Sequence, residues 1–472
     1  MKNVNTIFGG PGCGKTTYLI TLLEKLLKTC NPDEIALVSF TKKGCYEGRD
    51  RAMKKFGFGE NDFPYFRTIH SLCFRAAGLN RGAMIAKKHY KDFSNALGMS
   101  FLGYYTEDLI NNDDKYLQQL SLEINNPDRA ELTNEELDQR KLKYVRENYS
   151  RFKTESGVVD FDDLLVNYLG GGTALPVKVA IIDEAQDLTS AQWAFCFKAF
   201  QHCEQVYIAG DDDQAIYEWS GADVNKFLYM ARHSKVKILD KSYRLKTNIL
   251  DFSKKVLRKI ENRVEKNFAA ADKDGGVFFH NDLDEIPINN EQSYYFLSRN
   301  NYFLGSYKDT LLKTGMQFSF KGKDFGKKSE YNAIKKYEEL RKNAPEKIQR
   351  SVFLVEHLKP TATNDTPWYD ALDFSQETIS FWRNFFSHKS SIVNTGLNIG
   401  TIHSVKGGEA DNVVLSLDIT RNVNNALDKS HSLAAELRCL YVAFTRAKKN
   451  LHIIHSHTKY GLESIVPTQE VI

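Results

Sequence analysis

Residues 9–16 have the composition and spacing of a phosphate-binding loop. They read Gly-Gly-Pro-Gly-Cys-Gly-Lys-Thr and lie between a strand-like stretch and leucines at helical spacing. Glycines let successive backbone N–H groups converge on phosphate oxygens, Lys15 adds a positive charge, and the Thr16 hydroxyl can bind Mg²⁺. We therefore expect a nucleotide site formed by the loop residues Gly9, Gly10, Pro11, Gly12, Cys13, Gly14, Lys15 and Thr16.

An acidic pair at the end of an apolar run supplies the second half of such a site. Asp183 and Glu184 follow the run Ala180, Ile181 and Ile182. Asp183 would bind Mg²⁺, and Glu184 would polarise an attacking water. An isolated Asp-Glu pair can instead cap a helix by interacting with its dipole. The phosphate-binding loop upstream favours the catalytic interpretation.

Apolar runs separated by helical segments predict the elements that position these residues. Residues 35–40, 177–182 and 205–209 are continuous apolar runs, which are typical of buried strands in a parallel α/β sheet. A second α/β pattern begins near 236–239 and resumes at 397–401. The sequence therefore predicts two similar parallel sheets.

Two segments interrupt these patterns. Residues 70–160 are polar, rich in Lys and Glu and without a strand signal, so we expect a helical insertion there. Residues 321–393, approximately, have a mixed pattern and form a second insertion. Its first residues, 321–328, are rich in Lys and Gly, which favours a surface loop over a hinge.

The composition excludes several classes of protein. Hydrophobic residues make up 42% and charged residues 26%, and no stretch holds eighteen consecutive apolar residues, which argues against a membrane span. The chain starts without a secretory signal, so we expect a cytoplasmic location. The seven cysteines are scattered and contain no Cys-x-x-Cys pair, which argues against a disulfide framework or zinc site. The net charge of +4 is too balanced to indicate nucleic-acid binding by itself.

The sequence Asp-Glu-Ala-Gln-Asp at 183–187 resembles the second ATPase motif of the UvrD/Rep-like superfamily 1A DNA helicases. Other segments resemble the remaining motifs of this family, in family order: 39–44, 68–72, 160–165, 210–222, 242–244, 296–300, 400–409 and 440–447. The resemblance implies an α/β fold with two RecA-like P-loop domains, whose parallel sheets are flanked by helices. The expected parts are domain 1A (1–75 and 156–232), a helical 1B insertion (76–155), domain 2A (233–320 and 396–472) and a small 2B-like insertion (321–395).

The resemblance also assigns roles at the ATP site. Gln214 would sense the γ-phosphate, and Arg244 and Arg446 would act as arginine fingers from the second sheet. The implied catalytic set is Lys15, Asp183, Glu184, Gln214, Arg244 and Arg446. Tyr243 would stack on adenine, whose other face lies near Thr17, and Glu409 would reach the ribose. Each arginine can instead belong to a structural salt bridge.

The implied DNA contacts come from several motifs. Tyr217 and Trp219 would stack on successive bases, although most aromatic rings chosen blindly pack in a core. Tyr460 lies roughly where relatives have a pin that splits the duplex. His70 and His403 would contact the DNA backbone or couple it to ATP, and a structural imidazole is the alternative. The full implied set is Thr41, Lys42, Thr68, His70, Tyr217, Trp219, Thr401, His403 and Tyr460.

The resemblance implies an ATP-dependent single-stranded DNA translocase and DNA helicase that moves 3′ to 5′, with ATP and Mg²⁺ as cofactors and hydrolysis at the 1A/2A cleft. Its partners would be single-stranded DNA and tailed duplex DNA, and no membrane partner is expected. The alternative is a nucleotide-gated remodeller that displaces proteins from single-stranded DNA with little duplex unwinding. RNA could replace DNA as the track. The sequence leaves open whether the protein serves repair, replication, recombination or a mobile element. Relatives read adenine with a glutamine motif upstream of the loop, and only eight residues precede Gly9, so we expect a loose preference for ATP over GTP.

Overall fold

The computed structural model describes residues 3–39, 49–51, 53–103, 113–134, 137–272, 275–289, 291–363, 365–388, 392 and 396–468 of the chain. The chain forms two compact units, which are described separately. The first unit comprises Met1–Thr247, Val256–Lys273 and Ser430–Tyr441. The second comprises Asn248–Lys255, Asp274–Lys429 and Val442–Ile472.

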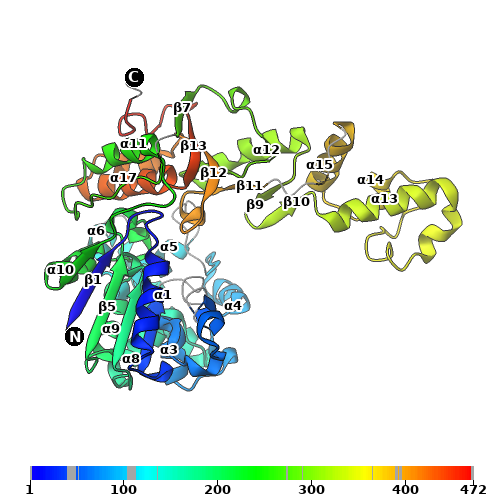
Figure 1. The fold of residues 1–472 in the computed structure, drawn as a ribbon. Coiled ribbons are helices and arrows are strands. Elements are labelled where there is room, and N and C mark those ends of the chain that lie inside the picture. Colours follow the sequence, from blue (N-terminus) through cyan, green and yellow to red (C-terminus); the bar gives the residue numbers. More distant parts are fainter. Residues whose placement is uncertain are drawn as a thin grey trace. The chain divides into compact units, whose positions relative to one another are not determined.

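In the first unit, the described residues form a parallel six-stranded sheet in the order β3-β2-β4-β5-β1-β6 (Figure 1). Its strands are β1 (Val4–Phe8), β2 (Ile35–Ser39), β3 (Phe66–Thr68), β4 (Val179–Asp183), β5 (Gln205–Gly210) and β6 (Lys235–Ile238). The central strands are continuously apolar because helices cover both faces of the sheet. These helices are α1 (Lys15–Leu26), α3 (Ile69–Ala76), α8 (Phe161–Gly171), α9 (Ser190–Ala199) and α10 (Val224–Arg232).

Strand β6 corrects one expectation. The sequence pattern placed residues 236–239 at the start of the second sheet, and the 2A boundary was expected at 233. The structure instead pairs β6 with β1 at the edge of the first sheet, and the first unit continues to Thr247. Val236 and Ile238 stay partly exposed. A four-residue edge strand of alternating Lys and apolar residues fits either sheet, so its partner depends on long-range packing.

The helical insertion has a core of its own. Its helices are α4 (Lys87–Leu97), α5 (Asp114–Asn125), α6 (Pro127–Asn134) and α7 (Gln139–Ser156). Phe93, Tyr116, Leu142, Val145 and Tyr149 are buried together in a cluster separate from those around the sheet. Within the described part of 70–160 no named strand occurs, as the sequence indicates.

In the second unit, the described residues form a seven-stranded sheet in the order β10-β9-β11-β8-β12-β13-β7. Its strands are β7 (Gly276–His280), β8 (Tyr294–Ser298), β9 (Phe318–Phe320), β10 (Lys323–Phe325), β11 (Leu397–Thr401), β12 (Ala410–Ser416) and β13 (Ala447–Ile454). All neighbouring strands are parallel except β9 and β10. The helices of this unit are α12 (Leu304–Thr314), α13 (Lys328–Asn343), α14 (Trp368–Ala371), α15 (Gln376–Ser387) and, after β12, α16 (Arg421–Ala426). Two further helices contribute residues to both units: α11 (Thr247–Leu257) and α17 (Ser430–Phe444).

The second insertion differs from the first in how it is packed. Lys321 and Gly322 have positive φ angles of 49° and 77° and make a tight turn between β9 and β10, so part of the expected surface loop is a hairpin. Tyr337 of α13 and Trp382 of α15 are buried in the same cluster as Phe296 of the sheet. The described part of this insertion therefore extends the core of the second unit.

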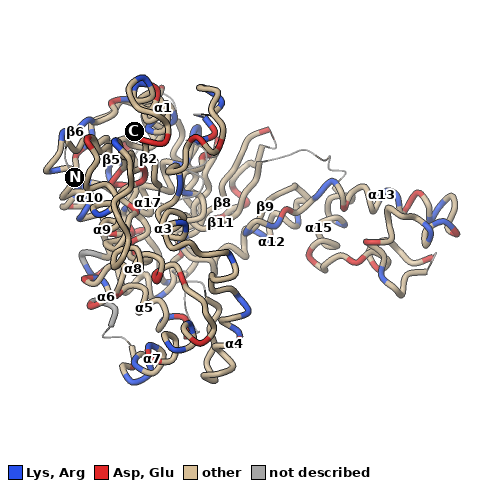
Figure 2. The backbone as a smooth tube through the Cα atoms, turned by 90° about the horizontal axis from the view of Figure 1, so that it is seen from below, with Lys and Arg blue, Asp and Glu red and all other residues tan. Residues whose placement is uncertain are grey.

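Among the described residues, the distribution of charged residues does not by itself mark a nucleic-acid surface. Figure 2 shows Lys and Arg interspersed with Asp and Glu in both units. Any site for an anionic ligand must therefore be argued from local geometry. Among the described residues, no helix has the length and apolar character needed to cross a membrane.

Candidate active site

The phosphate-binding loop has the geometry that its sequence predicts. It follows β1 directly, and the Gly9 N–H donates to the Gly210 carbonyl at 3.2 Å. Gly12 and Gly14 have φ angles of 72° and 73°, a conformation that side chains disfavour. Gly14 is the N-cap of α1, whose first turn holds no acidic residue. The positive end of the helix dipole, together with Lys15, is therefore available to an anion.

The acidic pair lies beside Lys15. The Lys15 Nζ is 2.8 Å from the Glu184 Oε2 and 3.7 Å from the Asp183 Oδ1. Burial raises the pKa of Asp183 to about 6, although Lys15 lowers it in part. Burial alone would lower the pKa of Lys15, but Glu184 and Asp183 outweigh it and hold the pKa above its usual value. These three groups together carry one net negative charge.

This donor set fits a divalent cation. Carboxylate and hydroxyl oxygens are the ligands that Mg²⁺ prefers. Asp183 is a buried carboxylate, and the positive charge of Lys15 offsets the cost of its burial only in part. Thr16 is the second residue of α1, directly after Lys15. Asp183 and Thr16 are thus suited to hold Mg²⁺ beside a bound triphosphate.

Glu184 is held in a strained backbone conformation. Its φ angle is 51°, in the left-handed region that costs a residue with a Cβ about 1–2 kcal/mol. Its Oε2 accepts hydrogen bonds from the Lys15 Nζ and, at 2.7 Å, from the Gln186 Nε2. Strain of this kind persists where surrounding contacts fix one orientation, and it concentrates at functional sites.

A chain of hydrogen bonds joins Glu184 to Gln214. The Gln186 side chain donates to Glu184 and accepts from the Asp211 N–H at 3.0 Å. The Gln214 Nε2 donates to the Asp211 Oδ2 at 2.7 Å. The structure therefore brings together Lys15, Asp183, Glu184 and Gln214, as the sequence predicts, and connects them through Gln186 and Asp211.

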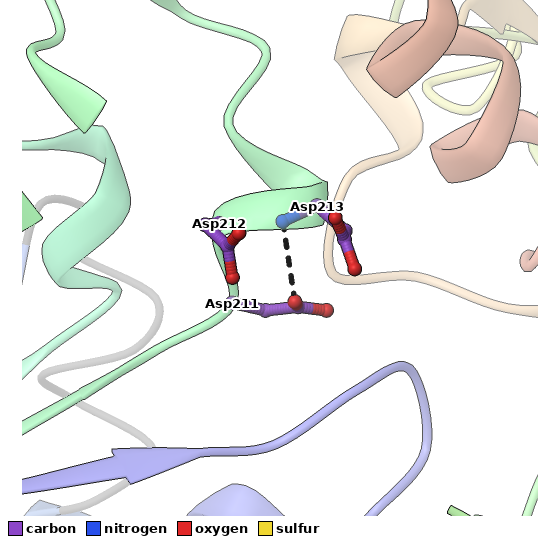
Figure 3. Close-up of side chains that lie close together, drawn as sticks. All are labelled: Asp211, Asp212 and Asp213. Atoms are coloured by element: carbon purple, nitrogen blue, oxygen red, sulfur yellow. Dashed lines mark hydrogen bonds between the residues drawn. The ribbon is translucent and has the colours of Figure 1, made fainter. Parts of the chain in front are cut away.

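Three consecutive carboxylates follow β5 (Figure 3). The ligand oxygens of Asp211, Asp212 and Asp213 lie within 4.8 Å of one another, and the Asp213 N–H donates to the Asp211 side chain. The Lys266 Nζ lies 3.2, 2.5 and 2.8 Å from the three carboxylates in that order. Arg263 adds two hydrogen bonds to Asp213. A side-chain ammonium therefore already occupies this cluster, and sequence motifs gave no sign of Lys266 or Arg263.

An open groove adjoins the phosphate-binding loop. It has a volume of about 560 Å³, and its lining comprises Gly12, Cys13, Gly14, Thr17, Tyr18, Thr21, Leu239, Asp240, Lys241 and Tyr243. The Tyr243 side chain is 73% exposed, while its N–H donates to the Gly12 carbonyl at 2.8 Å. The groove thus offers an exposed ring next to Thr17, which is the geometry that stacking on a base requires.

The placement of Tyr243 and Arg244 corrects another expectation. Both were expected from the second sheet, but they belong to the first unit. The Ser242 Oγ donates to the Pro11 carbonyl at 2.7 Å, and the Arg244 side chain is half-buried next to Gly12. Their placement follows from β6, because the segment after an edge strand of the first sheet runs beside the loop after β1.

The predicted DNA contacts of the first unit differ in their surroundings. Thr41 and Lys42 lie outside the described residues. The Thr68 Oγ1 caps α3 by accepting from the Ser71 N–H. Burial lowers the pKa of His70 to about 4, so this imidazole is neutral at pH 7, and it lies edge-on to Phe161.

Tyr217 and Trp219 are half-buried residues, and the Trp219 Nε1 atom is buried. The Trp219 carbonyl accepts from Gln118 at 3.2 Å, and the Ala222 carbonyl accepts from Asn126 at 3.2 Å. Gln118 within α5 and Asn126 at its C-cap therefore hold the backbone of this motif, and the two aromatic residues are half-buried. This arrangement is compatible with stacking on bases.

The second unit holds the remaining predicted residues. Arg446 is 1% exposed, and its guanidinium donates to the carbonyls of Val442 and Gly408 at 3.0 and 3.2 Å. The other residues expected there are half-buried Thr401, His403 and Tyr460, and exposed Glu409. Thr401 ends β11 and His403 begins the short 3-10 helix that follows.

Comparison with known proteins adds two family matches. The model of the UvrD/REP helicase N-terminal domain matches residues 1–235, and that of the UvrD-like helicase C-terminal domain matches residues 338–458. The ATP-dependent DNA helicase Rep of Buchnera aphidicola is 25% identical over 292 residues, which are 57% of this chain and 45% of that protein. The ATP-dependent DNA helicase PcrA of Bacillus subtilis is 23% identical over 355 residues, which are 67% of this chain and 48% of that protein.

The aligned part of the chain thus spans about half the length of these relatives. Among solved structures, the helicase nonstructural protein 10 of an arterivirus is 12% identical, with a TM-score of 0.37, over 98% of this chain and 62% of that one. At that TM-score the similarity carries no argument about this chain.

Proposed function

Because the chain belongs to the UvrD/Rep-like family of superfamily 1 helicases, we propose that it hydrolyses ATP and uses the energy to move along single-stranded DNA. The observation that carries this proposal is the network in which Lys15, Glu184, Gln186, Asp211 and Gln214 are joined by hydrogen bonds. It connects the phosphate-binding loop to the motif that bears Trp219. Loss of the γ-phosphate can therefore alter the position of Trp219, because hydrogen bonds and the chain itself connect the two sites.

Most groups of the proposed hydrolysis lie in the first unit. The loop N–H groups and Lys15 bind the phosphates, and Tyr243 stacks on the base. Asp183 and Thr16 would hold Mg²⁺, which stabilises charge on the phosphate oxygens during transfer. Glu184 accepts a proton from the attacking water, and Gln214 positions that water or the γ-phosphate.

The arginines complete the proposed chemistry. Arg244 lies beside Gly12 and is the candidate within the first unit to stabilise charge on the transferred phosphoryl group. The family resemblance predicts Arg446 as the second arginine finger and Glu409 as the residue that contacts the ribose. Glu409 is exposed, whereas the Arg446 guanidinium must leave backbone carbonyls to contact a ligand.

For the DNA track, we propose single-stranded DNA bound by Tyr217, Trp219, Thr68 and His70 in the first unit. Thr401, His403 and Tyr460 are the candidates in the second unit, and Thr41 and Lys42 complete the set. Contacts of these types are made to phosphates and base faces, so the binding would be independent of sequence. Movement 3′ to 5′ and a location in the cytoplasm are part of the same proposal.

The first test is ATP turnover with single-stranded DNA, duplex DNA and RNA as competing activators. We expect single-stranded DNA to stimulate most. Glu184→Gln should retain ATP binding and lower the turnover number by about 10²–10⁴, the usual range for loss of a general base. Vigorous hydrolysis by this variant would refute the assignment of Glu184.

A second test distinguishes unwinding from protein displacement. Strand displacement on 3′-tailed and 5′-tailed duplexes is measured beside displacement of streptavidin from biotinylated single-stranded DNA. The helicase proposal predicts displacement of the strand from the 3′-tailed duplex. Streptavidin release without strand displacement would instead support the remodeller, an alternative that the small, sheet-packed second insertion keeps open.

A further inference from the structure

Among the described residues of the first unit, Lys266 is the most completely buried lysine or arginine, and the proposed chemistry does not use it. Its side chain has no exposed surface, and its Nζ forms ion pairs with Asp211, Asp212 and Asp213. Burial alone would lower its pKa, but the three carboxylates outweigh it and raise the pKa above the usual value. Lys266 is therefore a permanent cation in the interior. Such ion pairs are often no more stabilising than apolar residues of similar volume, so stability alone does not account for them.

The contacts of Asp211 show what this cation can do. Its carboxylate pairs with Lys266 and accepts from the Gln214 Nε2 at 2.7 Å. Its N–H donates to the Gln186 Oε1, and the Gln186 Nε2 donates to Glu184. The ion pair with Lys266 thus fixes the position of Asp211, the residue to which Gln214 and Gln186 are both hydrogen-bonded.

The segment around Lys266 also contacts the phosphate-binding loop. The Lys266 Nζ lies 5.4 Å from the centroid of the Phe8 ring, at the end of β1. A Cβ built on Gly10 would lie 2.5 Å from the Phe268 ring. The same short segment therefore borders both the loop that holds the phosphates and the turn that bears Gln214.

We propose that Lys266 is a positioning residue for ATP hydrolysis, which sets Asp211 so that Gln214 and Gln186 are held in their catalytic orientation. The inference rests on the proposed ATPase activity and adds a residue that touches neither nucleotide nor DNA. Arg263 provides the contrast. It binds Asp213 alone among the three carboxylates, so it stabilises the cluster without holding the acceptor of Gln214.

The experiment compares three variants of the full chain. Lys266→Met alone would leave three carboxylates with only Arg263, which endangers folding. Lys266→Met combined with Asp212→Asn removes one charge of each sign, and the Asn oxygen can still accept the Val264 N–H that now binds Asp212. Asp212→Asn alone is the first control. Arg263→Gln is the second control, because it breaks an ion pair of the same cluster.

We expect the Lys266→Met/Asp212→Asn variant to fold, to bind ATP within about threefold of the wild type, and to lose at least tenfold in kcat of DNA-stimulated hydrolysis. A loss in kcat with little change in KM indicates an interaction made in the transition state. Arg263→Gln should lower the melting temperature while keeping kcat. Wild-type kcat in the double variant would overturn the proposal, as would a loss of kcat in Arg263→Gln that parallels its loss of stability.

Hydrogen exchange gives a readout that does not depend on hydrolysis. The Asp211 N–H, which is bonded to Gln186, should exchange faster in the Lys266→Met/Asp212→Asn variant and at the wild-type rate in Arg263→Gln. Unchanged exchange in the double variant would refute the positioning role. Absence of ATP turnover in the wild type would instead refute the proposed function, so the two failures are distinguishable.

Discussion

Replacing Gly12 with alanine tests how tightly the phosphate-binding loop is held by the segment that carries Tyr243 and Arg244. Gly12 has a φ angle of 72°, and a Cβ built on it would lie 2.4 Å from the Arg244 Cβ and 2.9 Å from the Ser242 Oγ. Neither neighbour is the free end of a long side chain. The added methyl group must therefore displace the backbone of the loop or of residues 242–244.

The expected cost has two parts. An alanine in the left-handed region costs about 1–2 kcal/mol, and inserting a methyl group into a filled space typically costs about 1–3 kcal/mol more. The sum is about 2–5 kcal/mol. Displacement would also break the 2.8 Å hydrogen bond from the Tyr243 N–H to the Gly12 carbonyl, and with it the position of the exposed ring over the groove.

Gly78 provides a matched control, because its φ angle is 63° and no atom lies within 4 Å of a Cβ built on it. Gly78→Ala should show only the conformational part, about 1–2 kcal/mol. Both variants are measured by thermal melting and by titration with a fluorescent ATP analogue. We expect Gly12→Ala to melt lower than Gly78→Ala and to bind the analogue weakly. Equal melting temperatures and wild-type affinity in Gly12→Ala would show that the loop is not braced in this way.

Three other perturbations follow from the same geometry. Tyr243→Ala should raise the KM for ATP by about 5–150-fold, since stacking on a base contributes about 1–3 kcal/mol, and Tyr243→Phe should restore it in steady-state kinetics. Trp219→Ala should weaken single-stranded DNA in fluorescence anisotropy by a similar factor without changing ATP affinity, and an unchanged DNA affinity would count against its stacking role. Burial and His280 lower the pKa of His452 to about 4, below the unfolded value near 6.5, so stability should fall by at most about 3 kcal/mol as pH falls from 6.5 to 4. His452→Gln should reduce that slope in urea denaturation, whereas an unchanged slope would assign it to other groups such as His70.

Local patterns in the sequence were sufficient for the parts of the site whose chemistry is local. The loop at 9–16 needs glycines at fixed spacing, and Asp183 and Glu184 need only an apolar strand before them, so both are visible in the sequence. Strands β2 and β4, inside the first sheet, are almost entirely apolar and are visible for the same reason. The structure confirms the predicted strands at 35–39, 179–183 and 205–210 and the helical character of the described part of the first insertion.

The errors came from features that depend on long-range pairing. The residues of β6 alternate between lysine and apolar side chains, a pattern that fits the edge of either sheet. Their pairing with β1 carried Tyr243 and Arg244 into the first unit. Lys266 was missed for a related reason. A lone lysine 53 residues or more from its carboxylate partners has no local signal in the sequence, and its burial is decided only when the chain folds back.

Arg244 and Arg446 show why a motif cannot specify a role by itself. The sequence treats both as arginine fingers, yet their surroundings differ. Arg244 is half-buried beside a glycine of the phosphate-binding loop, whereas the Arg446 guanidinium is enclosed and bonded to backbone carbonyls. Removing a buried guanidinium leaves its acceptors unsatisfied, at a cost of about 1–3 kcal/mol for each buried group. A loss of activity after changing Arg446 therefore combines chemistry with folding of the second unit, so Arg244 gives the cleaner measure of charge stabilisation at the γ-phosphate.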